Sequence, residues 1–81
     1  MSIKKQFYLT FPKKLVDQPI LFQVGHKFKV VTNIRGASVS HGVGRVALEM
    51  TGEKEQIERS KEWLESKGIV IEEMKEKKSH N

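Results

Sequence analysis

Three polar residues in the middle of the chain have side chains suited to hold a small zwitterion. Asn33 offers a hydrogen-bond donor and an acceptor, Glu49 accepts from an ammonium group, and Arg35 can bind a carboxylate through two parallel hydrogen bonds. We call these residues the polar trio. A free amino acid carries both groups that the trio would recognise. The alternative is a cross-strand polar pair with an ordinary surface ion pair, which contributes little to stability.

Nucleophilic catalysis has one candidate pair, Ser40 and His41, with Ser38 nearby. A serine becomes a nucleophile when an adjacent base removes its proton, and that base needs a partner to orient it. No carboxylate lies close to this pair in the sequence, and the residues of a tight turn account for it more simply. Gly36, Gly42 and Gly44 could suggest a loop that binds phosphate, but their spacing matches neither G-x-G-x-x-G nor G-x-x-x-x-G-K-[ST]. We therefore expect a protein that is not an enzyme.

The sequence contains no cysteine, which excludes disulfides, thiolate zinc sites and iron–sulfur clusters. Its three histidines, His26, His41 and His80, do not have the spacing of metal ligands. We expect neither a metal nor a cofactor.

Two neighbouring strands must position the polar trio. Residues 28–39 and 43–51 both alternate between two faces, and residues 40–42 between them are a candidate three-residue hairpin loop. With that loop, Gly36 shares the inner face with Ile34, whereas Ala37 shares the outer face with Arg35. The loop also predicts the cross-strand pairs Asn33 with Glu49, Ile34 with Leu48, Thr32 with Met50, and Arg35 with Ala47.

Four further elements surround this hairpin. Residues 3–11 alternate with Phe7, Leu9 and Phe11 on one face, which predicts a strand with one buried face. A short helix is expected at 18–27, with Asp17 as its N-cap. A second helix opens at residues 52–55 and stops at Gly68. Its narrow apolar stripe consists of Ile57, then Ser60 or Lys61, then Leu64. A short last strand begins at residues 69–71.

The predicted order, strand–helix–strand–strand–helix–strand, indicates an α+β fold. Right-handed crossovers fold this βαββαβ order into a ferredoxin-like split sandwich. Its antiparallel four-stranded sheet has the order 4-1-3-2, with two helices on one face. The other face is left open. Its expected residues are Tyr8, Thr10, Val31, Asn33, Arg35, Arg45, Ala47, Glu49, and Val70 or Glu72.

The chain of 81 residues has room for one small domain, with a core at about 5–74 and a flexible basic tail at 75–81. No apolar run approaches the ~20 residues of a membrane-spanning helix, and the start lacks the apolar core of a signal peptide. We therefore expect no membrane insertion and a cytoplasmic protein.

Positive charge is concentrated in one half of the chain. Residues 1–45 hold eight Lys and Arg against one Asp, whereas residues 46–81 hold seven against nine Glu. RNA-recognition modules share the expected topology but stack bases on aromatic residues of two strands. Here residues 44–50 contain no aromatic residue. Nucleic acid is thus disfavoured as a partner, apart from weak phosphate attraction through Lys13, Lys14, Lys27 and Lys29.

Several short motifs together give the sequence a family resemblance. They are TNIRG at 32–36, GRVALEMTG at 44–52, Ile57, and WLESKGI at 63–69. In this order and spacing the chain resembles the NIL domain family over residues 5–74. Asn33, Ile34 and Gly36 match the family's second-strand motif, and Arg35 stands where the family has leucine. That departure puts a cation on the open face.

The resemblance implies a regulatory domain that senses a small molecule. NIL domains occur at the C-terminus of methionine-importer ATPase subunits, where the domain pairs with its twin and binds the transported amino acid, and beside some ferredoxins. By this resemblance we expect a homodimer that binds methionine or another amino acid and acts on a client such as a transporter ATPase or a ferredoxin. Two alternatives stay open: a ligand-free interaction module and a weak electrostatic nucleic-acid binder. The expected ligand-binding residues are Asn33, Ile34, Arg35, Gly36 and Glu49.

Overall fold

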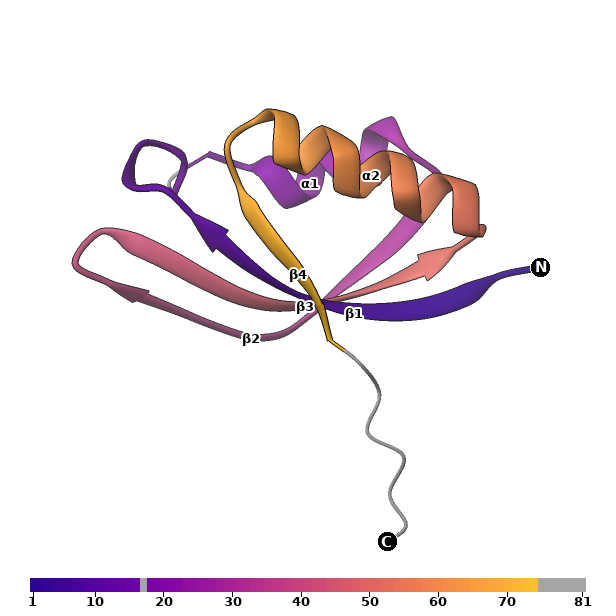
Figure 1. Ribbon diagram of the computed structural model, residues 1–81, viewed down its shortest axis with the longest axis horizontal. Helices are drawn as coiled ribbons and strands as arrows, with labels where there is room; N and C mark the ends of the chain where they lie inside the picture. The colour runs from indigo at the N-terminus through magenta and orange to yellow at the C-terminus, as the bar shows by residue number, and fades with distance from the viewer. Residues whose placement is uncertain (17, 75–81) are drawn as a thin grey trace, which may run out of the picture.

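The computed structural model describes residues 1–16 and 18–74. Its four strands form one antiparallel sheet in the order β2-β3-β1-β4, and both helices lie over the same face (Figure 1). This arrangement is the predicted ferredoxin-like split sandwich, with the strand order counted from the opposite edge. Its elements are β1 (Ile3–Phe11), α1 (Ile20–Lys27), β2 (Val30–Ser40), β3 (Val43–Gly52), α2 (Lys54–Ser66) and β4 (Val70–Met74), with a 3₁₀ turn at Lys13–Leu15.

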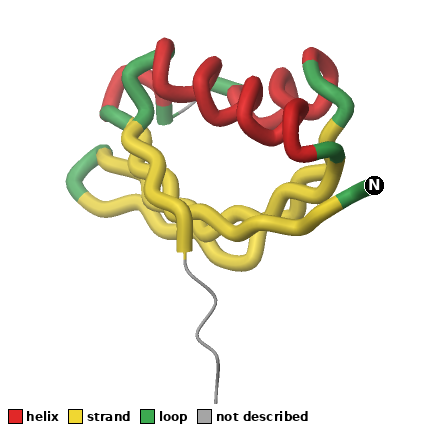
Figure 2. The backbone as a smooth tube through the Cα atoms, turned by 45° about the vertical axis from the view of Figure 1, so that its right-hand side comes forward, coloured by secondary structure: helices red, strands yellow, loops and turns green. Residues whose placement is uncertain are grey.

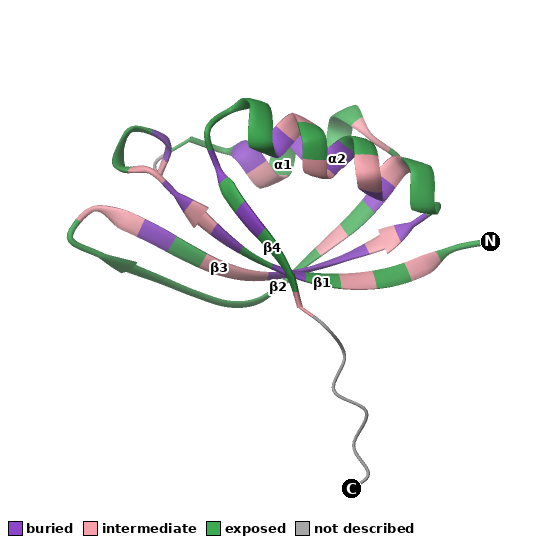
Figure 3. Ribbon diagram, viewed as in Figure 1, coloured by how far each residue is buried: buried purple, intermediate pink, exposed green. Residues whose placement is uncertain are grey.

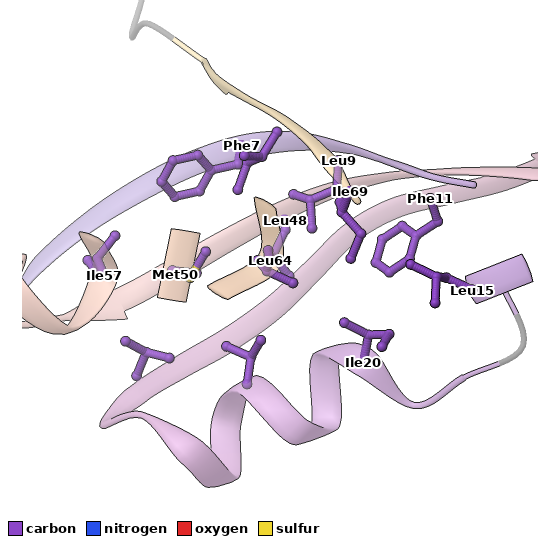
Figure 4. Packing of buried hydrophobic residues seen from close by; sticks show 13 residues of the cluster. Phe7, Leu9, Phe11, Leu15, Ile20, Leu48, Met50, Ile57, Leu64 and Ile69 are labelled. Atoms are coloured by element: carbon purple, nitrogen blue, oxygen red, sulfur yellow. The ribbon is translucent and has the colours of Figure 1, made fainter. Parts of the chain in front are cut away.

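Figure 2 shows the two helices as a layer over one face of the sheet. The core consists of the apolar residues that the sheet and this layer bury between them. Period-2 alternation places every second residue of β1 and β3 toward the helices. Phe7 and Leu9 are 1% exposed, and Leu48 and Met50 are fully buried. Figure 4 shows these side chains meeting those of the helices. The predicted inner faces of both strands are confirmed.

Each helix contributes one apolar stripe to this core. On α2 the buried residues are Ile57, Ser60 and Leu64, which confirms the predicted stripe and places Ser60, not Lys61, in it. α1 begins at Ile20, two residues later than predicted, with Pro19 at the N-cap position and no side-chain cap. The predicted cap Asp17 and the tail 75–81 lie outside the described residues. Neither described helix has the length and apolar character needed to cross a membrane.

The hairpin between β2 and β3 turns over two residues, not the predicted three. His41 and Gly42 have φ values of 54° and 80°, and Ser40 pairs directly with Val43. Positive φ at both central residues is the mark of a type I′ turn, whose twist matches that of the flanking strands.

A β-bulge at Arg35 absorbs the one-residue difference. The predicted pairs Thr32–Met50, Asn33–Glu49 and Ile34–Leu48 are present, but Ala47 pairs with Gly36 and not with Arg35. The two-residue turn offsets the pairs next to it by one residue from the pairs at the far end of the hairpin. Arg35 is the extra residue on β2 that makes up this difference. The predicted pair Arg35–Ala47 is therefore wrong.

The bulge also exchanges the faces of the residues that follow it. Gly36 pairs with Ala47 on the open face, and Ala37 pairs with Val46 on the helix side. Both assignments are the reverse of the prediction, because a one-residue slip turns every later side chain over. In Figure 3 the outer part of β2 is exposed along its length. Ile34 and Val39 are 55% and 66% exposed there.

Candidate functional site

The polar trio lies together on the open face, next to the bulge. Asn33 Nδ2 is 3.5 Å from Glu49 Oε1, and an Arg35 guanidinium nitrogen is 3.8 Å from Glu49 Oε2. β2 and β3 set the first contact by pairing Asn33 with Glu49. The bulge brings Arg35 to the second carboxylate oxygen, because the extra residue bends the strand and re-aims its side chain.

Glu49 is the buried member of the trio. It is 7% exposed, although it lies on the sheet face that no helix covers. Gln6 of β1 is its neighbour on the side away from Asn33. The side chain of Arg35, by contrast, is 59% exposed. The ion pair is therefore half in solvent, where screening makes it weak.

The two contacts on Glu49 leave hydrogen-bonding capacity unused. A carboxylate accepts at about four lone-pair positions, and a strong charged hydrogen bond is about 2.7–2.9 Å long. Both contacts of Glu49 are longer than that. The side chain of Glu49 is 10% exposed, whereas the guanidinium of Arg35, whose side chain is 59% exposed, has donors open to solvent.

The remaining expected ligand-binding residues lie on different sides of the sheet. Gly36 lies on the open face. Ile34 lies on the helix side, because it pairs with the buried Leu48, and it sits at the outer edge of the sheet. The geometry thus joins Asn33, Arg35 and Glu49 and separates Ile34 from them.

A hollow of about 630 Å³ adjoins the trio on the open face. Of the expected ligand-binding residues only Gly36 lines it. Ala47, which lies two residues before Glu49 on this face of β3, forms part of its wall, so the trio lies at the border of the hollow. Its lining residues are Tyr8, Leu9, Thr10, Gly36, Ala37, Ser38, Arg45, Val46, Ala47 and Glu72.

Opposite charges stand on the two sides of this hollow. Arg45 lies on β3, and Glu72 lies on β4 beside Tyr8 of β1. Sequence reasoning placed these residues on the open face but did not include them in the site. Arg45 and Glu72 alternate with buried residues along their strands, and this alternation is what predicted that they lie on the open face. What was missing was the register of β4, which brings Glu72 beside Tyr8.

The candidate catalytic pair forms a contact inside the hairpin turn. Ser40 Oγ is 3.1 Å from His41 Nδ1, and both residues are exposed. Among the described residues no carboxylate is hydrogen-bonded to His41. Residues 1–16 and 18–74 also contain no group of three acidic or histidine side chains that could hold a metal ion.

Comparison with known proteins identifies one family. The NIL domain family matches residues 5–73. No curated protein matches the chain closely enough to count as a relative. One similar solved structure is the C-terminal domain of an ABC transporter ATP-binding protein from Enterococcus faecalis. Its TM-score is 0.76 at 20% identity, over 86% of this chain and 82% of that chain.

A de novo designed protein also shares the fold. The de novo designed protein Foldit4 has a TM-score of 0.58 at 12% identity, over 95% of this chain and 100% of its own. The fold alone therefore implies no activity. A function for this chain must be argued from its side chains.

Proposed function

This chain belongs to the NIL domain family, and we propose that it is a non-catalytic regulatory domain that binds a free amino acid such as methionine. The observation that carries the proposal is the buried Glu49 between Asn33 and the exposed Arg35. A carboxylate on an open sheet face with unused acceptor positions suits a ligand ammonium group.

The ligand lies across the bulge. Its ammonium group binds Glu49, and its carboxylate binds the guanidinium of Arg35, which offers several donors in a fixed plane. Asn33 can donate to the ligand carboxylate through its amide N–H or accept from the ligand ammonium group through its amide oxygen. The ligand side chain extends past Gly36 and Ala47 into the adjoining hollow, where the ring of Tyr8 supplies apolar surface.

The partner in this proposal is a protein that responds to the occupied domain. The similar domain from Enterococcus faecalis belongs to an ABC transporter ATP-binding protein, and a transporter ATPase is accordingly the first client to test, with a ferredoxin as the second. We place the domain in a homodimer paired through the outer edge of β2, which leaves the open face accessible to the ligand.

Thermal melts with a panel of L-amino acids test ligand binding. A ligand at 100 times its Kd adds about 2.7 kcal/mol of stability, which for a domain of this size is a Tm rise of about 10 °C or more. We expect a rise confined to one or two amino acids, and its loss in Asn33→Ala and Arg35→Gln. Arg59→Gln is the matched control, because Arg59 lies on α2 and its ion pair is with Glu55 at 3.3 Å. A flat panel contradicts the proposal.

Exposed apolar residues at one edge favour a second candidate, a ligand-free module that pairs with another copy of itself. β2 is an edge strand of eleven residues, and such edges invite pairing with another chain. Ile34 and Val39 on β2 and Phe22 on α1 are more than half exposed. If this is the whole function, Val39→Lys converts a dimer into a monomer in sedimentation experiments, while no amino acid changes the Tm.

A further inference from the structure

The hairpin end of the open face presents a cluster of hydrogen-bond donors. A hollow of about 420 Å³ is lined there by Ser38, Ser40, His41, Val43 and Arg45. It is distinct from the polar trio, none of whose members lines it. It shares Ser38 and Arg45 with the hollow beside the trio.

Strand register places these side chains on one face. Ser38 is directly opposite Arg45, and Ser40 is directly opposite Val43. Cross-strand partners share a face, and residues two apart on a strand also share one. The two hydroxyls and the guanidinium therefore point the same way. The register depends on the two-residue turn and the bulge at Arg35, so it was not accessible from the sequence pattern.

His41 adds a donor from the turn. The hydroxyl of Ser40 lies 3.1 Å from Nδ1. In the neutral tautomer that accepts this bond at Nδ1, the proton is on Nε2, which is left to donate. In the charged form Nδ1 donates to the hydroxyl, whose own proton then becomes available. Either state leaves the pair with a donor for a ligand.

Negative charge is absent from the lining of this hollow. None of its five residues is acidic, and within residues 1–16 and 18–74 Arg45 makes no ion pair. Thr10 is its neighbour on β1. Its other ladder neighbour is Ser38, so both cross-strand neighbours of Arg45 carry a hydroxyl group. Glu72, which shares the adjoining hollow with Arg45, does not line this one. The lining of this hollow, at the hairpin corner of the open face, therefore has one permanent cation, several neutral donors and no carboxylate. A second cation, Lys13, has its side chain beside Gly42 of the turn but does not line the hollow.

We propose that this corner is a binding site for a small phosphate monoester. A phosphate group presents three strong acceptor oxygens, and a guanidinium binds two of them side by side. The hydroxyls of Ser38 and Ser40 and the His41 ring are placed to donate to the third. A nucleic-acid backbone suits the corner less well, because it needs a row of cations and this hollow has a single arginine. The proposal goes beyond amino-acid sensing and stands without it.

The ¹⁵N–¹H spectrum of the protein titrated with adenosine monophosphate, in the absence of amino acids, tests the site. One charge-assisted contact and two or three neutral hydrogen bonds predict a Kd of about 1 mM. We expect saturable shifts at Ser38, Ser40, His41 and Arg45. Arg45→Gln should weaken binding about 10-fold or more. Arg59→Gln removes the same charge from the helix layer and should leave the affinity unchanged.

Adenosine and a single-stranded oligonucleotide complete the experiment. Adenosine, which lacks the phosphate, should give no shifts at the four residues. The proposal is overturned if adenosine binds as well as the monophosphate, if Arg59→Gln weakens binding as much as Arg45→Gln, or if no saturable shift appears. It is also overturned if the oligonucleotide shifts Lys13 and Lys14 at far lower concentration than the monophosphate needs at Arg45. Ser40→Ala, an exposed substitution, provides a second variant if Arg45→Gln fails to fold.

Discussion

Replacing Gly52 by alanine should destabilise the domain strongly. Gly52 is the last residue of β3 and is buried. A Cβ atom there would stand 2.8 Å from the backbone oxygen of Lys29 and 3.2 Å from Cγ1 of Val30. Since the nearest atom belongs to the backbone, the start of β2 must move. Overpacking of this kind costs about 1–3 kcal/mol, and a loss of about 2 kcal/mol lowers the Tm of a small domain by roughly 8–16 °C.

Thermal and urea unfolding of matched glycine variants measure this effect. Gly25 lies inside α1, and a Cβ atom added there would meet no neighbouring side chain or strand within 4 Å. Gly25→Ala should therefore raise stability by about 0.5–1 kcal/mol, because alanine is the better helix former. Equal Tm changes in Gly52→Ala and Gly25→Ala would contradict this prediction. They would mean that the start of β2 leaves room for a Cβ atom at position 52.

Substitutions at three other positions test the core packing, the hairpin turn and the candidate site separately. Leu48→Ala removes a fully buried side chain from the centre of the core and should cost about 2–5 kcal/mol in urea unfolding; a cost below about 1 kcal/mol would contradict the core described here. His41→Val should lower stability by about 1–2 kcal/mol because φ is 54° at this position, whereas His41→Asn suits a type I′ turn and should not. Glu49→Gln should change stability by about 1 kcal/mol or less, because both partners of the carboxylate are distant, yet it should abolish amino-acid binding; a large loss of stability would instead make Glu49 a structural residue.

The sequence pattern was sufficient to predict the fold and the pairing of β2 with β3 as far as Ile34 and Leu48. Alternation along β1, β2 and β3 specifies which face is buried, and a wrong register would bury polar side chains. That constraint predicted the pair Asn33–Glu49 and hence the core of the candidate site. It weakens toward the hairpin end, where all residues of β2 from Asn33 to Ser40 are exposed, so that burial does not distinguish one register from the other.

The bulge at Arg35 could not be read from the pattern because it depends on the turn. The turn has His41 at positive φ, a conformation that is uncommon for any residue other than glycine. A three-residue loop with glycine alone in that region looked more favourable. The two-residue turn then required an extra residue on β2, and this residue is the arginine that departs from the family motif.

The hollow beside the trio was missed for a different reason. Its charged walls, Arg45 and Glu72, come from strands that are separated by β1. Their proximity depends on how β4 pairs with β1. A strand of five residues carries too little alternation to specify that pairing in advance.

The most direct test of the proposed amino-acid site is a ¹⁵N–¹H titration of the protein with L-methionine, followed by the amino acids that raise the Tm. We predict saturable shifts centred on Asn33, Gly36, Ala47 and Glu49, which disappear in Glu49→Gln and persist in Arg59→Gln. Shifts confined to β4 and the helices, or no shifts at millimolar ligand, would contradict this prediction. The open face of β2 and β3 would then not be an amino-acid site.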